Sequence, residues 1–375
     1  MLQKPSVFRG LLAVEDVFML SSKIPRLTAA QRQRRRRLWK KYLWRRLAII
    51  AVALSVLGLS VWGVVSGIGA LMALTRTPVP EVEEPETVVT VPPEPEPPKV
   101  LHPVADNQTI TLTNEVDAPC AILVDVTEGR VVAQKNPDKR GYPASITKMM
   151  TLLVAVENTE DFDSTYEMTF DIVNDTYQQG ASRAGFGVGE KVSVTDLLYG
   201  CILPSGADAT IGLANHLSGS EPEFVKLMNK RCEALGLKNT HFQNTSGLHG
   251  DKHYSTAADM AVILMAAMQD ETCKEVLSAV KYTTAKTPEN PDGLELYSTL
   301  FSRMYGNEPT GATVIAGKTG YTSEAGHTMA SYAVGDDGHD YVVVTMGGSN
   351  RWKATYDCIN LLTRYVGGTT EGLYS

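Results

Sequence analysis

Residues 141–155 read GYPASITKMMTLLVA, a stretch that joins a proline, a serine, a lysine and an apolar run. Pro143 ends the preceding segment, and the apolar pattern that follows predicts a helix from Ser145 to about Glu157. Because residues three apart share a helical face, Lys148 should return beneath the Ser145 hydroxyl. A serine is a weak nucleophile until a neighbour takes its proton, and a lysine with a lowered pKa can do this. Alone, S-x-x-K is more typical of an N-cap serine beside a solvated lysine.

Two further motifs follow at wide spacing. Residues 204–209 read PSGADA after an apolar helical run, and Ser205 offers a hydroxyl that could relay a proton. Residues 317–320 read GKTG where a strand pattern ends, and glycine permits close approach of backbone to a ligand. There Lys318 offers a positive charge for a carboxylate, and Thr319 offers a hydroxyl. The order S-x-x-K, second serine, K-T-G is typical of penicillin-binding proteins and class A β-lactamases.

Four blocks resemble the serine-type D-alanyl-D-alanine carboxypeptidases, the low-molecular-mass penicillin-binding proteins. They read AILVDVTEGRVVAQKNPDKRGYPASITKMMTLLVA, VTDLLYGCILPSGADA, NTSGLHGDKHYSTAADMA and GKTGYTSEAGHTMASYA, and the likeness covers nearly all of residues 117–362. The resemblance implies an α+β penicillin-binding, serine β-lactamase-like transpeptidase fold, with an antiparallel five-stranded sheet flanked by helices. It implies removal of the terminal D-Ala from peptidoglycan stem peptides through a serine acyl-enzyme, trimming cell-wall precursors. β-Lactams would be covalent inhibitors, and neither cofactor nor metal is implied.

The same resemblance implies a role for each matching residue. The catalytic residues would be Ser145 as nucleophile, Lys148 as base for acylation and Ser205 as the second-motif hydroxyl. The substrate-binding residues would be Lys318, Thr319, Gly320, Tyr321 and Arg351. The backbone N–H groups of Ser145 and Tyr321 match an oxyanion hole, and Arg351 matches an arginine that helps to hold the terminal carboxylate. By its own position just past a strand, Arg351 would be taken for a solvated surface charge.

One departure weakens the match. The family's second motif is normally Ser-Gly-Asn, and here Ala207 stands in the third place. Alanine cannot bond the lysine amine or the substrate amide, and losing one such contact costs about 10²–10³ in rate. Asp208 does not replace the asparagine, because the family already carries aspartate there. A weakly active or non-catalytic cell-wall-binding relative therefore remains an alternative.

A β-lactamase-like hydrolase is the other alternative. Class A enzymes need a further glutamate for deacylation. No convincing Glu-x-x-Leu-Asn stretch lies between the second and third motifs.

Strand patterns stand at both ends of the globular part, with helical patterns between them. Residues 121–126 and 131–134 flank a turn and predict a hairpin. Further strands are predicted at residues 313–316, 329–334 and 341–346, and capping boxes at 193–196 and 256–259. We expect a terminal sheet packed against a helical cluster.

The N-terminal part predicts a membrane protein. A basic run inside residues 1–46 abuts residues 47–74, which are uncharged and mostly apolar. A spanning helix needs about 20 such residues, and Lys and Arg favour the cytoplasmic side. We expect a cytoplasmic basic tail, one uncleaved transmembrane anchor and an extracytoplasmic remainder in a bacterial cell membrane, with a cleaved signal as the alternative. The formal net charge is -7, and the position of the basic run favours membrane over nucleic acid.

Residues 75–104 are rich in proline and glutamate and predict an extended spacer of up to about 90 Å. It would hold a catalytic domain of residues 105–375 out in the cell wall. Many members of the family add a β-rich domain and an amphipathic C-terminal helix, for which the residues after Arg364 leave no room. The N-terminal anchor would then supply the membrane attachment.

The five cysteines and the histidines suggest no metal site. The cysteines are sparse and lack metal-ligand spacing, so small buried hydrophobes are expected, with one bonded pair left open. His241, His249 and His253 invite a zinc interpretation, but HGDKH contains a glycine and is typical of a loop.

Overall fold

The computed structural model describes residues 102–368. The predicted tail, the predicted anchor and nearly all of the predicted spacer lie outside these residues. Within the described range, no helix is long and apolar enough to cross a membrane.

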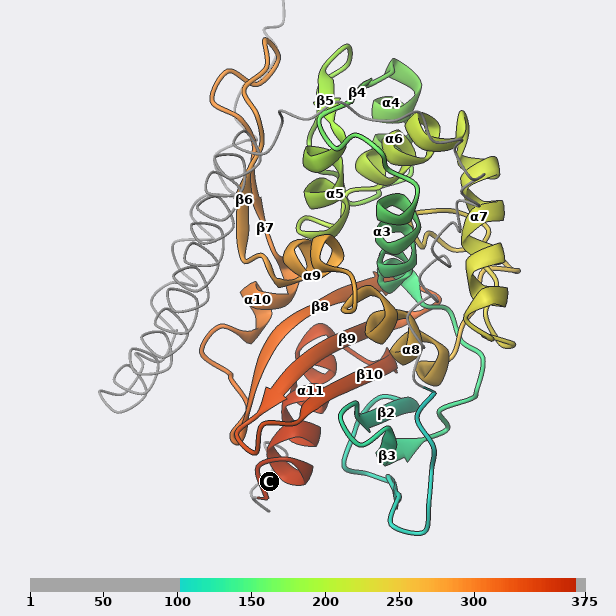
Figure 1. Cartoon of the computed structure of the whole chain (residues 1–375), viewed down its shortest axis with the longest axis vertical. Coiled ribbons are helices and arrows are strands. Elements are labelled where there is room, and N and C mark those ends of the chain that lie inside the picture. Colours follow the sequence, from blue (N-terminus) through green and yellow to red (C-terminus); the bar gives the residue numbers. More distant parts are fainter. Residues whose placement is uncertain (1–101, 369–375) are drawn as a thin grey trace, which may run out of the picture. The chain divides into compact units, whose positions relative to one another are not determined.

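A six-stranded sheet, in the order β1-β3-β2-β10-β9-β8, forms the centre of the described part (Figure 1). Its strands are β1 (Ile110–Thr111), β2 (Cys120–Asp125), β3 (Arg130–Lys135), β8 (Ala312–Thr322), β9 (Gly326–Gly335) and β10 (Asp340–Gly348). Five of them pair antiparallel, as predicted. The sequence prediction missed β1, which pairs with β3 in parallel, so the sheet is mixed. This two-residue strand covers backbone groups that would otherwise be open at the β3 edge.

Helices surround this sheet. They are α3 (Lys148–Glu157), α4 (Phe170–Gln178), α5 (Val194–Ile202), α6 (Ala207–Ser218), α7 (Glu221–Ala234), α8 (Ala257–Ala267), α9 (Glu271–Ser278), α10 (Thr299–Met304) and α11 (Arg351–Tyr365). Two small hairpins, β4 (Thr165–Glu167) with β5 (Lys191–Ser193) and β6 (Lys281–Thr283) with β7 (Glu295–Tyr297), lie apart from the main sheet.

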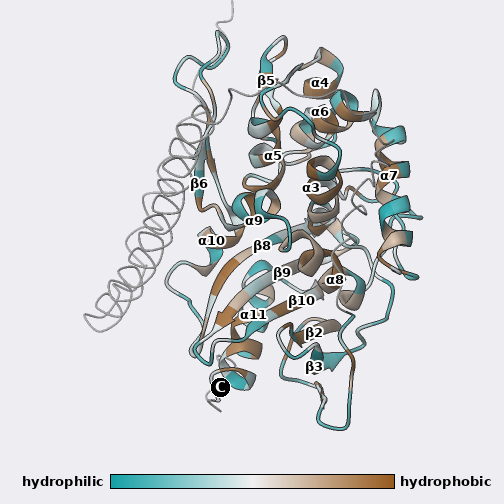
Figure 2. Ribbon diagram, in the orientation of Figure 1, coloured by the Kyte–Doolittle hydropathy of each residue, from teal (hydrophilic) through white to brown (hydrophobic). Residues whose placement is uncertain are grey.

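Both faces of the sheet are buried, because its central strands carry continuous apolar runs. Along β2, Ile122 and Val124 join the core beneath α3, α5, α6 and α8. Ala121 and Leu123 point the other way, into a second core that α11 completes. Figure 2 shows the apolar character of α3 and α8, and both helices are buried along almost their whole length. The sheet is therefore the middle layer of three.

Local signals placed most elements correctly. The predicted hairpin is β2–β3, and the three later strands are β8, β9 and β10. Ser193 and Thr256 cap α5 and α8 by accepting hydrogen bonds from the backbone N–H groups of Asp196 and Asp259, which confirms both N-caps. The Asp196 and Asp259 carboxylates accept from the Tyr282 and Thr240 hydroxyls instead, so the reciprocal half of each predicted capping box does not form.

Two boundaries differ from the prediction. The helix expected from Ser145 opens as a 3₁₀ turn, η1 (Ala144–Thr147), and becomes α-helical only at Lys148. The distortion begins at Ala144, whose φ of 50° is unusual for a residue with a side chain. The GKTG stretch lies inside β8 and not at its end, because pairing with β9 continues as far as Thr322.

Candidate active site

The serine and lysine of the first motif meet as their spacing predicts. Lys148 Nζ donates a hydrogen bond to Ser145 Oγ at 3.1 Å and another to the Ser246 carbonyl at 2.5 Å. Burial lowers the pKa of Lys148 to about 8, and the carboxylates of Asp208 and Glu221 oppose this shift. A useful fraction of the amine is therefore neutral near neutral pH, so it can accept the serine proton.

Ser145 is held between β8 and the loop of residues 244–248. Thr328 Oγ1, on β9, donates to the Pro143 carbonyl at 2.9 Å, which ties the start of η1 to the sheet. A Cβ atom at Gly320 would lie 2.7 Å from Ser145 N, so only glycine lets β8 come this close. The backbone of β8 thus runs beside the N–H group of Ser145, as an oxyanion site shared by Ser145 and Tyr321 requires.

The second motif presents a strained hydroxyl. Ser205 lies between α5 and α6 with φ of 68°, a conformation that costs about 1–3 kcal/mol for a residue with a side chain. Its side chain is buried, and Oγ has no hydrogen-bond partner among the described residues. Because a buried unpaired hydroxyl is costly, this group is ready to bond an incoming ligand.

Asp208 fixes the geometry around Ser205. Its buried carboxylate accepts hydrogen bonds from the backbone N–H groups of Ala184 at 2.8 Å and Gly185 at 3.0 Å. Ala207, between the two, is buried, and its N–H donates to the Ser182 carbonyl at 2.8 Å. The second motif therefore contributes a hydroxyl but no side-chain amide.

The third motif sits inside β8. Lys318 is almost wholly buried and donates to the Thr319 carbonyl at 2.8 Å. Burial, and then the Lys148 amine, hold the pKa of Lys318 well below its ordinary value. A carboxylate ligand beside this amine would favour its charged form. Thr319 Oγ1 lies 2.9 Å from Thr299 Oγ1 on α10.

Arg303, on α10, was not singled out from the sequence, because no local motif marks it. Its NH1 atom is buried without a hydrogen-bond partner in the part of the chain that the structure describes. Burial, and then Arg351, lower the pKa of Arg303. Burial, and then Arg303 and Arg351, lower the pKa of His327. The ring of His327 stacks on Tyr321 at 4.4 Å between centroids. These cations and the end of β8 therefore share one neighbourhood, which suits a carboxylate ligand.

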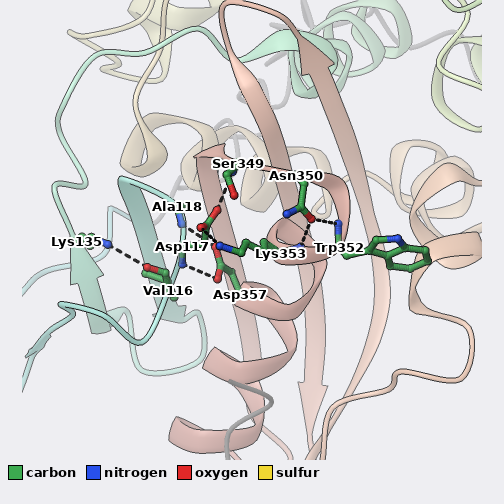
Figure 3. Close-up of polar contacts among 9 residues, drawn as sticks. All are labelled: Val116, Asp117, Ala118, Lys135, Ser349, Asn350, Trp352, Lys353 and Asp357. Atoms are coloured by element: carbon green, nitrogen blue, oxygen red, sulfur yellow. Dashed lines mark hydrogen bonds and ion pairs between the residues drawn. The ribbon is translucent and has the colours of Figure 1, made fainter. Parts of the chain in front are cut away.

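Arg351 itself is exposed and opens α11, with its guanidinium 5.2 Å from the centre of the Trp352 ring. Asn350 caps this helix by accepting hydrogen bonds from the N–H groups of Trp352 and Lys353 (Figure 3). The backbone that carries Arg351 is thus fixed, while its side chain reaches the surface.

A carboxylate pair anchors the same segment from behind (Figure 3). Asp117 accepts hydrogen bonds from Ser349 N and Lys353 Nζ, each at 2.7 Å. Asp357, which is fully buried, accepts from the N–H groups of Asp117 and Ala118 at 2.8 Å each. The residue that follows β10, helix α11 and the segment before β2 are therefore joined at one point.

The histidines and cysteines take structural positions. His253 Nε2 lies 2.8 Å from Thr147 Oγ1, and Nδ1 accepts from Gln243 N at 3.1 Å. Burial lowers the pKa of His253 to about 3, so the ring is neutral. No three His, Cys, Asp or Glu side chains of residues 102–368 are grouped so as to hold a metal ion. All five cysteines are buried, as expected of small hydrophobes, and none is bonded to another.

Comparison with known proteins gives consistent matches. A family model, peptidase S11, described as D-alanyl-D-alanine carboxypeptidase, matches residues 106–350. The D-alanyl-D-alanine carboxypeptidase DacA of Haemophilus influenzae is 34% identical over 62% of this chain. DacF of Bacillus subtilis, with the same description, is 32% identical over 58%. The chain spans only 58% and 54% of the lengths of these two relatives.

Solved structures agree on the fold. Penicillin-binding protein 5 from Haemophilus influenzae superposes with a TM-score of 0.60 at 29% identity, over 68% of this chain and 72% of that one. A DD-transpeptidase from Streptomyces gives 0.61 at 26% identity, over 68% of this chain and 98% of that one. The α+β transpeptidase fold that the resemblance implied is thereby confirmed, with the mixed sheet in place of a purely antiparallel one.

Proposed function

This chain belongs to the peptidase S11 family of D-alanyl-D-alanine carboxypeptidases, and from this premise we propose that it removes the terminal D-Ala from D-Ala-D-Ala stem peptides of peptidoglycan. The observation that carries the proposal is the hydrogen bond between Lys148 Nζ and Ser145 Oγ, at a lysine whose pKa is about 8. A surface lysine beside an N-cap serine would be solvated and keep its ordinary pKa. This one is buried and aimed at the hydroxyl.

The chemistry follows from these positions. Ser145 Oγ attacks the carbonyl carbon of the D-Ala-D-Ala bond while Lys148 takes the hydroxyl proton. The N–H groups of Ser145 and Tyr321 stabilise the oxyanion of the tetrahedral intermediate. Its collapse breaks the C–N bond, and the leaving amine takes a proton from Lys148, directly or through Ser205. A water molecule then hydrolyses the ester on Ser145, which releases the shortened peptide and restores the free hydroxyl.

Specificity for a C-terminal D-Ala requires a site for its carboxylate. Thr319 offers a hydroxyl, Lys318 offers a buried amine, and Arg303 offers a buried N–H group that lacks a partner in the described region. Arg351 adds a positive charge at the rim. We assign the substrate carboxylate to this group of side chains.

The absence of an amide at Ala207 favours a slow enzyme within this proposal. The non-catalytic alternative is disfavoured by the buried Ser145–Lys148 pair, since maintaining a buried amine without a function would be costly. A β-lactam would acylate Ser145 in either case. The β-lactamase alternative therefore differs from the carboxypeptidase only in how fast the penicilloyl ester on Ser145 is hydrolysed.

Outside the described residues, we propose that residues 47–74 anchor the chain in a bacterial cell membrane. Residues 1–46 would lie in the cytoplasm, and the spacer of residues 75–104 would carry the catalytic domain of residues 105–375 outside. The apolar run and its basic flank support this. The mass of the protein purified from membranes tests it. An intact N-terminus supports the anchor, and loss of residues up to about 73 would refute it.

The activity is tested with the full chain in detergent. D-Ala release from a diacyl-L-Lys-D-Ala-D-Ala peptide is followed beside labelling by fluorescent penicillin, with Ser145→Ala as control. We expect slow release together with stable labelling, both lost in the variant. Rapid turnover of the penicillin would support a β-lactamase instead. If the chain shows no labelling and no D-Ala release, the proposal is refuted.

A further inference from the structure

The second hydrogen bond of Lys148 leads to a loop that the sequence did not mark as functional. Its acceptor, the Ser246 carbonyl, belongs to residues 244–248. The Asn244 side chain closes the turn by accepting from Gly247 N at 2.7 Å. The neighbouring carbonyl of Thr245 accepts from Thr151 Oγ1 on α3 at 2.7 Å, so the loop lies along the helix that begins with Lys148.

A glutamate from another element anchors this loop. Glu221, the first residue of α7, accepts hydrogen bonds at Oε1 from Thr245 N at 2.9 Å and from Thr245 Oγ1 at 2.6 Å. Thr245 is fully buried, and its Oγ1 also lies 3.0 Å from Thr210 Oγ1 on α6. Hydrogen bonds to a charged acceptor are stronger than neutral ones. The Glu221 carboxylate therefore holds Thr245, the residue directly before the one whose carbonyl accepts from Lys148.

We propose that Glu221 is a positioning residue for the serine–lysine pair, which holds residues 244–247 so that the Ser246 carbonyl orients the Lys148 amine toward Ser145. The inference rests on the proposed function. It gives Glu221 a role in that function although Glu221 touches neither the substrate nor Ser145. Because the amine has two acceptors, moving the carbonyl would let it turn away from Ser145 Oγ. The acylation rate would fall while the fold persists.

Glu221 also acts on Lys148 through its charge. Four other titratable groups act on Lys148 from neighbouring elements: Cys201 on α5, Asp208 on α6, Lys318 on β8 and His253. Their effects on Lys148 can be distinguished from that of Glu221. Burial raises the pKa of Cys201 to about 12, so its thiol is neutral, and His253 is neutral as well. Asp208 is committed to backbone N–H groups of another loop. Glu221 is therefore the anion that both holds the loop and favours the charged form of Lys148.

Three variants separate position from charge. Glu221→Ala removes the acceptor and the charge, whereas Glu221→Gln keeps an oxygen acceptor and removes only the charge. Thr245→Val removes the hydroxyl donor and keeps the charge. Glu223→Ala is the matched control, because Glu223 is also an acidic residue in the first turn of α7 but makes a surface ion pair with Lys226.

The measurement is the second-order rate constant for labelling of the full chain by fluorescent penicillin between pH 6 and pH 9.5, with thermal unfolding in parallel. We expect the plateau rate to fall at least about 10-fold in Glu221→Ala, and several-fold in Thr245→Val without a shift of the acid limb. Glu221→Gln should keep the plateau within about threefold and move the acid limb to lower pH, since a lost anion lowers the pKa of Lys148. Glu223→Ala should match the unaltered chain.

Plateau and acid limb both unchanged in Glu221→Ala, even at a lower unfolding temperature, would overturn the inference, because Glu221 would then be structural only. If Glu221→Ala does not fold, unchanged profiles in both Glu221→Gln and Thr245→Val have the same meaning. Labelling of the unaltered chain distinguishes a failure of the proposed function from a failure of the role of Glu221. Its absence would overturn the proposed function, and with it the role of Glu221.

Discussion

Lys148 Nζ lies 3.1 Å from Ser145 Oγ, and the two atoms share a hydrogen bond. The spacing of three residues brings the side chains to one face, and the 3₁₀ turn of η1 tightens that approach. Burial of the amine lowers its pKa to about 8, so more of it is neutral than for a surface lysine. Proximity and a lowered pKa are the two properties that a base for serine needs.

The pH dependence of acylation follows directly from this pair. Only the neutral amine can take the serine proton, so the rate should rise with pH and reach half its plateau near pH 8. Below that point it should fall about tenfold per pH unit. Labelling by fluorescent penicillin from pH 6 to pH 9.5 measures this. A rate that does not vary, or one that still rises tenfold per pH unit at pH 9.5 as the ordinary lysine value of 10.5 would require, would contradict the assignment of Lys148.

Ala207→Asn should raise turnover. The substitution restores the asparagine of the family's second motif, and one such polar contact is worth about 10²–10³ in rate. Since Ala207 is buried, part of this gain will be offset by crowding, and we expect an increase of about tenfold in D-Ala release. Ala207→Val adds bulk without an amide and should lower the rate. An unchanged or reduced rate in the asparagine variant would count against the reading of the second motif.

Arg303→Met should raise KM for a D-Ala-D-Ala peptide by about 10-fold to 100-fold. Its partnerless N–H group is expected to meet the substrate carboxylate, and a hydrogen bond to a charged group is worth about 1.5–3 kcal/mol. A peptide with a C-terminal amide is the control. The unaltered chain and Arg303→Met should have the same high KM for this amide peptide. If Arg303→Met raises KM equally for both peptides, Arg303 does not bind the substrate carboxylate.

Asp357→Asn should lower the free energy of unfolding by about 1–3 kcal/mol. The amide can accept at one oxygen only, so one of the two N–H groups of Asp117 and Ala118 loses its acceptor in a buried place. Thermal or urea unfolding measures the loss. Asp251→Asn is the control, because its side chain is 98% exposed. Equal stability of the two variants would mean that the anchor of Figure 3 does not support α11 as described.

The parts predicted from sequence are those encoded locally. The S-x-x-K spacing brings Lys148 to Ser145, and the caps of α5 and α8 start both helices. Apolar runs bounded by turn residues predict five strands of the sheet. Each of these depends on residues within one or two turns of the chain. The choice of Ser205 as a catalytic candidate needed the family resemblance as well.

The parts that were missed depend on distant segments. Glu221 reaches Thr245 across 24 residues, and nothing near either residue marks the contact. Arg303 is an ordinary arginine on a short helix until burial leaves its N–H group unpaired. The parallel strand β1 has only two residues, too few for an alternating pattern. Tertiary contacts decide such features, and one sequence does not encode them in a local pattern.

The most direct test is the mass of the full chain after incubation with penicillin, followed by peptide mapping. We predict one covalent adduct, on Ser145, lost in Ser145→Ala and formed at least about 100-fold more slowly in Lys148→Ala. An adduct on another residue, or no adduct on a folded chain that binds the drug, would contradict the claim that Ser145 and Lys148 form the catalytic pair.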